Sequence, residues 1–160
     1  MPRGARILLR NVLYHIINRG NQKERIFLEG SDYQEYLRIL KHYKCKFRFK
    51  VFGYCLMPNH VHIMLELKNP QDLAKIMQCL TQTYTKWFNK KYEKVGHLWQ
   101  GRFKNMVIQK DDYLINCISY VEANPVRAGI VRFPADYCWS SYKDRVFGNK
   151  NALLDLPDST

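Results

Sequence analysis

A chain of 160 residues, 46% hydrophobic and 14% aromatic, is long enough for one folded domain with its own core, which excludes a disordered or fibrous protein. Its 26 lysines and arginines against 14 acidic residues give a formal net charge of +12, which predicts a polyanionic partner. No apolar run approaches the length of a membrane span, so we expect nucleic acid and no membrane. Without a visible secretory signal or a C-x-x-C pair, the five cysteines favour a reducing, cytoplasmic location.

The first predicted elements are a strand and a helix. Residues 12–18 are rich in β-forming side chains and stop at Arg19-Gly20-Asn21, which predicts a strand followed by a turn. Ser31 and Gln34 have the spacing of a capping box, and apolar residues recur after them at helical spacing as far as Tyr43. We therefore expect a helix that begins near Ser31.

A β-hairpin and a second helix come next. Residues 47–57 and residues 60–67 are rich in β-forming side chains and alternate, so each segment is predicted to form a strand. The short turn at Pro58-Asn59 between them is typical of a hairpin. Pro70 suits the first turn of a helix, and the apolar stripe behind it extends to about Tyr92.

The last predicted elements are a loop, a strand and a third helix. Residues 96–101 contain two glycines and are predicted to form a loop, and residues 102–109 alternate as a strand. Asp111 or Asp112 is expected to cap the third helix. That helix should end near Asn124, because the proline that follows disfavours the α conformation of its predecessor.

The order β-α-β-β-α-β is typical of the ferredoxin-like α+β fold, an antiparallel sheet with helices on one face, here with an additional C-terminal helix that carries a tyrosine. We expect one domain over residues 8–131 and an extension over residues 132–160 that packs on it, with a flexible end beyond about Gly148. The second face of the sheet is then free for a ligand. Because the same fold hosts RNA-recognition modules, architecture alone does not select a function.

Two histidines on the third predicted strand are candidate metal ligands. Strand side chains alternate between faces, so His60 and His62 point to the same side of the sheet. Two adjacent imidazoles can bind one divalent cation, with selectivity set by the other ligands. The competing interpretation is a structural or surface role, which is the commoner fate of a lone His-x-His pair.

A tyrosine and an asparagine near the end of the third helix extend this site. Tyr120 and Asn124 lie four residues apart and hence on one helical face. Asn124 offers an amide oxygen at a helix C-terminus, whose partial negative charge favours a cation. With the two histidines it would leave open positions suited to Mg²⁺ or Mn²⁺ and to phosphate oxygens. Tyr120 could then attack a bound phosphate and form a phosphotyrosine, although a helical tyrosine is more often half-buried core.

Several blocks of the sequence resemble the signature motifs of the REP-associated tyrosine transposases, which belong to the single-tyrosine HUH transposases of small bacterial insertion sequences. The likeness extends in order over about residues 8–145. The blocks are residues 18–21 (NRGN), 56–62 (LMPNHVH), 96–104 (GHLWQGRFK), 120–129 (YVEANPVRAG) and 139–142 (WSSY).

This resemblance implies a ferredoxin-like core that cuts and rejoins single-stranded DNA near short hairpins through a 5′-phosphotyrosine. It implies a divalent metal held by His60 and His62, with Asn124 at the position of the third, variable ligand. The nucleophile falls on Tyr120. Glu122 stands where many relatives carry another residue, which changes the local charge and leaves these roles intact.

Basic and aromatic residues supply candidate DNA contacts. Arg102 and Lys104 alternate along a predicted strand and so point to one face. Trp99 is expected either to stack on an unpaired base or to anchor the core, and Arg127 either to contact DNA or to cap its helix. His15 and His97 receive no metal role, because neither has a close partner in sequence. The predicted DNA-binding set is Arg3, Arg6, Arg10, Arg19, Trp99, Arg102, Lys104 and Arg127.

The leading hypothesis is therefore a metal-dependent endonuclease and strand transferase that acts on single-stranded or hairpin DNA. The alternatives are a non-catalytic single-stranded nucleic-acid-binding protein and a domesticated regulator on the same fold. A homodimer, in which Tyr120 could serve the histidines of a neighbour, is a weaker expectation.

Overall fold

The structure is a computed structural model that describes residues 12–108, 113–148 and 153–157. The predicted cap at Asp111 or Asp112 and the basic residues Arg3, Arg6 and Arg10 lie outside the described residues. The helices and strands in chain order are β1 (Val12–Arg19), α1 (Gly30–Phe47), β2 (Lys50–Met57), β3 (His60–Leu67), α2 (Leu73–Tyr92), β4 (Lys104–Ile108), α3 (Tyr113–Glu122), α4 (Asn124–Arg127) and α5 (Tyr142–Phe147). Short 3₁₀ turns lie at Asn21–Lys23, Pro70–Asp72 and Pro134–Asp136.

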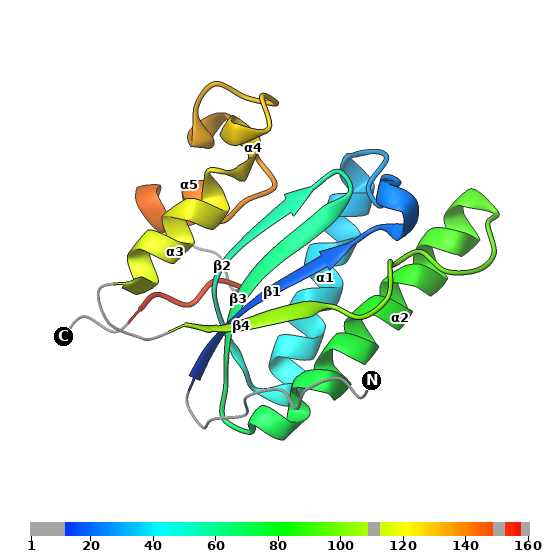
Figure 1. Cartoon of the computed structure of the whole chain (residues 1–160), viewed down its shortest axis with the longest axis horizontal. Coiled ribbons are helices and arrows are strands. Elements are labelled where there is room, and N and C mark those ends of the chain that lie inside the picture. The colour runs from blue at the N-terminus through cyan, green and yellow to red at the C-terminus, as the bar shows by residue number, and fades with distance from the viewer. Residues whose placement is uncertain (1–11, 109–112, 149–152, 158–160) are drawn as a thin grey trace, which may run out of the picture.

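The strands form one antiparallel sheet in the order β2-β3-β1-β4. Helices α1 and α2 lie on one side of this sheet and α3 lies on the other (Figure 1). This arrangement confirms the predicted ferredoxin-like α+β fold with an additional tyrosine-bearing helix.

The main core lies between the sheet and helices α1 and α2. Even-numbered residues of β1 such as Tyr14 and Ile16 point into it, together with Ile63 of β3. Helix α2 adds the fully buried ring of Tyr84, whose hydroxyl donates to the backbone carbonyl of Ile26 at 2.5 Å. Burial of so many aromatic side chains makes this side the chief source of stability.

A smaller core lies on the opposite face, where α3 packs against β2. Its members include Leu13 and Cys55 from the sheet and Ile118 from α3. The helix approaches so closely that a Cβ at Gly53 would stand 3.2 Å from a methyl carbon of Ile118. The face that we expected to be free is therefore covered by α3 over β2.

The start of α1 corrects the predicted capping box. The helix begins at Gly30, and the buried carboxylate of Asp32 accepts hydrogen bonds from the backbone amides of Leu28 and Glu29. The Ser31 hydroxyl instead donates to the Glu29 carboxylate. Asp32 takes this role because its side chain can bond both free amides while also pairing with Lys91.

The end of α1 corrects the predicted start of the second strand. Phe47 is the last residue of the helix and packs against the main core. Arg48 follows with a left-handed φ of 56° and ends the helix, and β2 begins at Lys50. The β-forming character of residues 47–49 hid this boundary, because tertiary packing overrides local propensity.

The C-terminal segment lies along the outer edge of β2. The Leu56 amide donates to the carbonyl of Trp139 at 2.8 Å, and the Ser141 amide donates to the carbonyl of Tyr54 at 3.0 Å. The Trp139 ring stacks on Tyr33 of α1 with centroids 4.7 Å apart. In the part of the chain that the structure describes, no helix is long and apolar enough to cross a membrane.

Candidate functional site

The predicted histidine pair lies at the start of β3, on the face of the sheet that carries α3. His60 pairs with Arg19 of β1 and His62 pairs with Ile17, so both side chains point to the same face. Their ring centroids are 5.0 Å apart, and the rings are nearly perpendicular. His62 is 7% exposed and His60 is half-buried, which leaves one open approach to the pair.

A neighbouring asparagine holds the ring of His60. The Nδ1 of His60 lies 2.7 Å from the Oδ1 of Asn59. The Asn59 amide nitrogen donates to the carbonyl of Lys23 at 3.3 Å, which fixes the orientation of that amide. Since an amide oxygen only accepts hydrogen bonds, the proton of neutral His60 sits on Nδ1, and Nε2 carries the free lone pair.

A third histidine holds the ring of His62. The Nε2 of His15 lies 2.9 Å from the Nδ1 of His62, and the two rings stack with centroids 5.2 Å apart. In the tautomer in which Nδ1 of His62 donates this hydrogen bond, Nε2 of His62 keeps its lone pair for a cation. Metal ligands of this kind are commonly oriented by such a partner.

The sequence interpretation gave His15 no metal role because it has no close partner in sequence, and the structure supplies a spatial partner, His62. His15 lies 47 residues away from His62 along the chain, but β1 and β3 are adjacent in the sheet. The alternation of β1 places His15 on the same face as Ile17, directly opposite Met64 and diagonal to His62. The signal was present in the strand period, but the strand order was needed to use it.

Burial and nearby positive charges keep these imidazoles neutral. Burial lowers the pKa of His60 to about 4, with a smaller contribution from the charge of Arg19. Burial also lowers the pKa of His62 to about 3, assisted by His15, His60, Arg19 and Arg127. At neutral pH both rings are therefore uncharged, each with one N–H and one nitrogen lone pair, which is the form that binds metals.

Tyr120, Asn124 and Arg127 form a cluster at the end of α3. The Tyr120 side chain is 60% exposed, and the Arg127 guanidinium carbon lies 3.8 Å from the centroid of its ring. Arg127 also donates to the Tyr120 carbonyl at 2.7 Å and to the Oδ1 of Asn124 at 3.0 Å. The contact with the Tyr120 carbonyl is the helix-capping role that was one of the two expectations for Arg127.

The position of Asn124 differs from the prediction. Helix α3 ends at Glu122, and Asn124 begins the short helix α4, with Pro125 in its first turn. The Asn124 amide nitrogen donates to the carbonyl of Val121 at 3.0 Å, so the side chain still lies against the end of α3. Pro125 suits this position because the first turn of a helix has no use for its missing amide proton.

A buried ionic contact fixes α3 on the sheet. Glu122 is fully buried, and its carboxylate accepts hydrogen bonds from the Ser141 hydroxyl at 2.6 Å and from the Nε of Arg145 at 3.0 Å. Helices α3 and α4 pack on β2, which is the neighbour of β3. The charge of Arg127 reaches His62 and contributes to its lowered pKa. The tyrosine cluster and the histidines therefore lie on the same face of the sheet.

The donors on this face suit a divalent cation. In the part of the chain with described coordinates, no three His, Cys, Asp or Glu side chains converge as a metal-binding group. The histidines provide two free Nε2 atoms, and the Asn124 amide oxygen is an oxygen donor that Arg127 currently holds. Two imidazoles and one amide oxygen leave open coordination positions, as a catalytic cation requires.

Three of the predicted DNA contacts line one cationic cavity. Arg19, Arg102 and Lys104 surround a cavity of about 350 Å³ together with Lys23, Ile17 and Gln100. The residues that line it include no carboxylate. Arg19 is also the β1 residue that pairs with His60, so this cavity borders the histidine pair.

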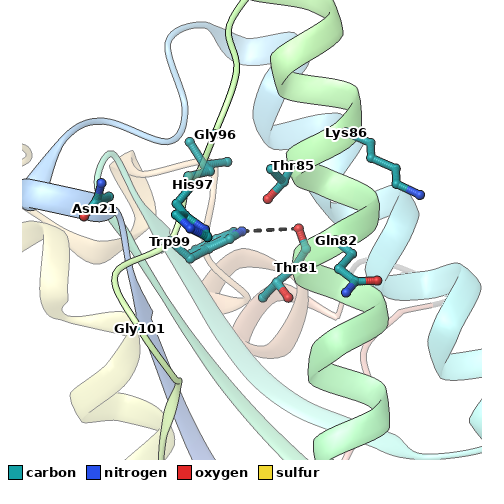
Figure 2. A pocket seen from close by; sticks show the side chains of 10 residues that line it. Asn21, Thr81, Gln82, Thr85, Lys86, Gly96, His97, Trp99 and Gly101 are labelled. Atoms are coloured by element: carbon teal, nitrogen blue, oxygen red, sulfur yellow. Dashed lines mark hydrogen bonds between the residues drawn. The ribbon is translucent and has the colours of Figure 1, made fainter.

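Trp99 belongs to the core. Its side chain is 9% exposed, its ring lies near those of Tyr36 and Tyr84, and its Nε1 donates to the carbonyl of Thr81 at 3.3 Å (Figure 2). The core-anchor interpretation therefore describes Trp99, because little of the ring remains for a base to stack on.

Comparison with known proteins places these features in a wider group. Residues 9–124 match the family pattern described as Transposase IS200 like. A protein of Haemophilus influenzae named as a REP-associated tyrosine transposase is 30% identical over an alignment 118 residues long, which covers 67% of this chain. The chain spans 64% of the length of that curated relative.

Two solved structures share the fold. The structure of a REP-associated tyrosine transposase bound to a REP hairpin matches with a TM-score of 0.77 and 19% identity, covering 100% of this chain and 96% of that one. The crystal structure of a protein described as a transposase from Deinococcus radiodurans matches with a TM-score of 0.52 and 14% identity, covering 74% of this chain and 94% of the other.

Proposed function

The chain belongs to the IS200-like transposase family, and on that basis we propose that it is a metal-dependent endonuclease and strand transferase for single-stranded DNA next to hairpins. Tyr120 is the nucleophile in this proposal. His60, His62 and Asn124 are the ligands of a divalent cation, Mg²⁺ or Mn²⁺.

The observation that carries the proposal is the state of the two histidines. Both imidazoles are held at Nδ1, by Asn59 and His15, and both keep Nε2 free on the face that also carries the tyrosine cluster. A cation needs lone pairs at both Nε2 atoms, which the structure supplies when Nδ1 of His60 donates to Asn59 and Nδ1 of His62 donates to His15. A bound cation would polarise a phosphodiester and offset the negative charge that develops during its cleavage.

The side chains of this site divide the reaction between them. The Tyr120 hydroxyl oxygen forms a bond to the phosphorus of the strand, and the bond from phosphorus to the 3′ oxygen breaks. The phenolic proton passes to solvent, since Tyr120 is 60% exposed, and the leaving strand ends in a 3′ hydroxyl. Attack by a second 3′ hydroxyl on the phosphotyrosine reverses these steps and joins a new strand without ATP.

Arg127 has a positioning role in this reaction. In the structure its guanidinium covers the Tyr120 ring and bonds the Asn124 oxygen. For Asn124 to act as a ligand, Arg127 has to release that oxygen, and a phosphate is the natural competitor for a guanidinium. Binding of the DNA strand would therefore free Asn124 and place a positive charge beside the phosphate.

The proposed substrate is a single strand with an adjacent hairpin. The cationic cavity formed by Arg19, Lys23, Arg102 and Lys104 borders His60 and suits a phosphate backbone. A protein with the same fold is bound to a REP hairpin, and we extend hairpin recognition to this chain.

A covalent-capture assay tests the proposal. The protein is mixed with Mn²⁺ and a labelled oligonucleotide that carries a hairpin and a single-stranded flank, and denaturing gels are used to detect a protein–DNA adduct. We expect an adduct with the wild type and none with Tyr120→Phe, which should still bind the oligonucleotide. An adduct with the Phe variant would exclude Tyr120 as the nucleophile.

A non-catalytic DNA-binding protein is the second candidate, because Arg127 occupies the oxygen of the predicted third ligand. On this alternative, the wild type binds the oligonucleotide and forms no adduct with Mg²⁺ or Mn²⁺. Arg127→Ala distinguishes a blocked enzyme from a binder, since only a blocked enzyme would gain adduct formation when Asn124 is released.

A dimer in which Tyr120 serves the histidines of a second copy is tested by mixing variants. Tyr120→Phe and His60→Ala are each expected to be inactive alone. If Tyr120 acts across a dimer, their mixture recovers adduct formation on the His60→Ala chain, and if Tyr120 acts within one chain, the mixture stays inactive.

A further inference from the structure

A large pocket with both polar and apolar lining residues lies between α2 and the loop that leads to β4 (Figure 2). Its volume is about 840 Å³, within the usual range for a bound ligand of about 300–1,000 Å³. Asn21, Thr81, Gln82, Thr85, Lys86 and His97 contribute amides, hydroxyls, an imidazole and one ammonium group to its lining. None of the described residues that line it is acidic, so the pocket suits a hydrogen-bonding, anionic ligand.

A second cavity of about 250 Å³ adjoins this pocket and shares Thr81, Trp99 and Gly101 with it. Asn18 of β1 lines the second cavity and is 3% exposed, yet its side-chain carbonyl oxygen has no hydrogen-bond partner. A buried amide oxygen without a partner is unfavourable and uncommon in native proteins. A donor group of a bound ligand would satisfy the side-chain oxygen of Asn18.

The cationic cavity beside His60 adjoins the cavity of Asn18. Arg102 lines both that cavity and the cavity of Asn18. The backbone of residues 98–100 extends the pairing of β4 with β1, since the Gln100 amide donates to the Arg19 carbonyl at 2.8 Å. The three cavities therefore follow one another around this edge of the sheet, from the histidine face to α2.

We propose that these cavities form one binding track for the single-stranded flank of the DNA substrate, with an unpaired base beside Asn18 and the next nucleotide in the pocket of Gln82 and Lys86. The proposal rests on the proposed function. Arg19, Lys23, Arg102 and Lys104 bind phosphates at the end of the track near His60.

The chemistry of Asn18 gives the track a base preference. An amide oxygen accepts a hydrogen bond from an exocyclic amino group, which adenine, cytosine and guanine carry, whereas an unpaired thymine offers only the N3–H of its ring, so the preference expected is for a base with an amino group. Lys86 lies on α2 and is exposed, so its ammonium group can bind a phosphate in the larger pocket by charge attraction. The track thus combines general binding of the backbone with selection at one position.

A binding experiment that needs no chemistry tests the track. Fluorescence anisotropy compares a hairpin that carries a single-stranded flank with the same hairpin without the flank, in the Tyr120→Phe background. We expect Gln82→Ala combined with Lys86→Ala to raise the Kd for the flanked hairpin at least fivefold and to leave the Kd for the bare hairpin unchanged. Lys90→Ala is the matched control, because Lys90 lies one turn further along α2 and is exposed outside the cavities.

A base scan of the flank tests Asn18 directly. When Asn18 is present, a flank with thymine at one position is expected to bind at least threefold more weakly than a flank with adenine or cytosine there. Asn18→Leu should remove that difference. Circular dichroism checks that the Leu variant is folded. If it is not, photocrosslinking of a flank with 5-iododeoxyuridine, mapped by mass spectrometry, is expected to label His97.

Two outcomes would overturn the track. One is an equal loss of affinity for flanked and bare hairpins in the Gln82 and Lys86 variants, or no loss for either. The other is a flat base scan together with crosslinks that lie only outside these cavities. Neither outcome bears on adduct formation by Tyr120, so the track can fail while the proposed function stands.

Discussion

The two faces of the sheet are built in opposite ways. Under α1 and α2 the face is closed by aromatic rings, and the buried carboxylate of Asp32 is satisfied by hydrogen bonds from the backbone, Lys91 and Tyr92. Over the rest of the sheet, α3 covers β2 and leaves His60 and the exposed ring of Tyr120 accessible. The first face holds the fold together, and the second keeps polar groups available to a ligand.

This contrast indicates that stability and chemistry can be changed separately. The Asp32 carboxylate on the closed face has its partners inside the protein, so replacing it leaves donors unpaired. On the open face, no described group of the protein depends on the Nε2 atoms of His60 and His62 for a hydrogen bond. Substitutions on the two faces should therefore affect different measurements.

The largest effect is expected on the open face. His60→Ala should lower the rate of adduct formation by about 10²–10³-fold, because it removes one of two imidazole ligands, while the melting temperature changes little. His42→Ala is the control, since His42 is an exposed histidine of α1. Rates are measured with excess Mn²⁺ and unfolding by circular dichroism. A matching loss of stability would indicate that His60 has a folding role.

On the closed face we expect a slightly smaller effect, and it concerns the free energy of unfolding. Asp32→Asn should lower the free energy of unfolding by about 3 kcal/mol, because the new amide nitrogen would face donors that the buried carboxylate now accepts from, the backbone amides of Leu28 and Glu29 and the hydroxyl of Tyr92. Adduct formation by the folded protein should be unchanged. Urea unfolding measures the loss.

The control for Asp32 is Glu35→Gln, which removes a contact with the exposed side chain of Arg38. Such an ion pair is worth less than about 1 kcal/mol, so the Gln variant should unfold near the wild-type urea concentration. If both variants lost the same stability, Asp32 would be no more than another surface charge.

Substitution of Arg127 should have a moderate effect on the affinity for DNA and on its salt dependence. Arg127→Gln is expected to weaken DNA binding about three- to tenfold and to reduce the slope of log Kd against log salt by about 1, because one phosphate contact is lost. Arg38→Gln, on the closed face, should leave both values unchanged. An unaltered salt slope for the Arg127 variant would restrict Arg127 to its contacts with Tyr120 and Asn124.

The smallest expected effect is a dependence of stability on pH. Burial lowers the pKa of His60 to about 4 and that of His62 to about 3, whereas an unfolded histidine has a pKa near 6.5. Between these values the unfolded chain binds protons that the folded chain does not, so stability falls as the pH drops from about 6.5 toward 4.

Thermal unfolding at several pH values measures this dependence. His62→Gln should flatten the fall in melting temperature between pH 6.5 and 4, because it removes one proton acceptor of the unfolded state. The exposed His42 provides the control His42→Gln, which should keep the wild-type dependence. An equally steep fall in both variants would assign the effect to groups other than the buried histidines.

The sequence predicted the fold well where side-chain periodicity was clear. The strand of His60 and His62 and the helix from Pro70 to Tyr92 lie where alternation and the apolar stripe placed them. The helix start near Ser31 is confirmed, whereas the capping box at Ser31 and the strand start at Phe47 were wrong, because a buried carboxylate and a packed ring decide these boundaries. Such contacts depend on residues that are distant in sequence.

The candidate site was predictable residue by residue but not as an arrangement. The sequence indicated His60, His62, Tyr120 and Asn124, yet the partnership of His15 with His62 follows from the pairing of β1 with β3. That Arg127 holds the Asn124 oxygen depends on the break between α3 and α4. Spacing along a chain indicates which residues share a face, and only the packed structure shows which atoms are already engaged.

The C-terminal segment beside β2 has a consequence for how short the protein can be made. β2 is an outer strand, and its backbone groups at Tyr54 and Leu56 are bonded by residues 139–141. A chain shortened after residue 131 would expose that edge and would also lose Arg145, the ionic partner of Glu122. Exposed strand edges pair with other chains, so we expect the shortened protein to aggregate. We also expect α3, which carries Tyr120, to be held less firmly against the sheet.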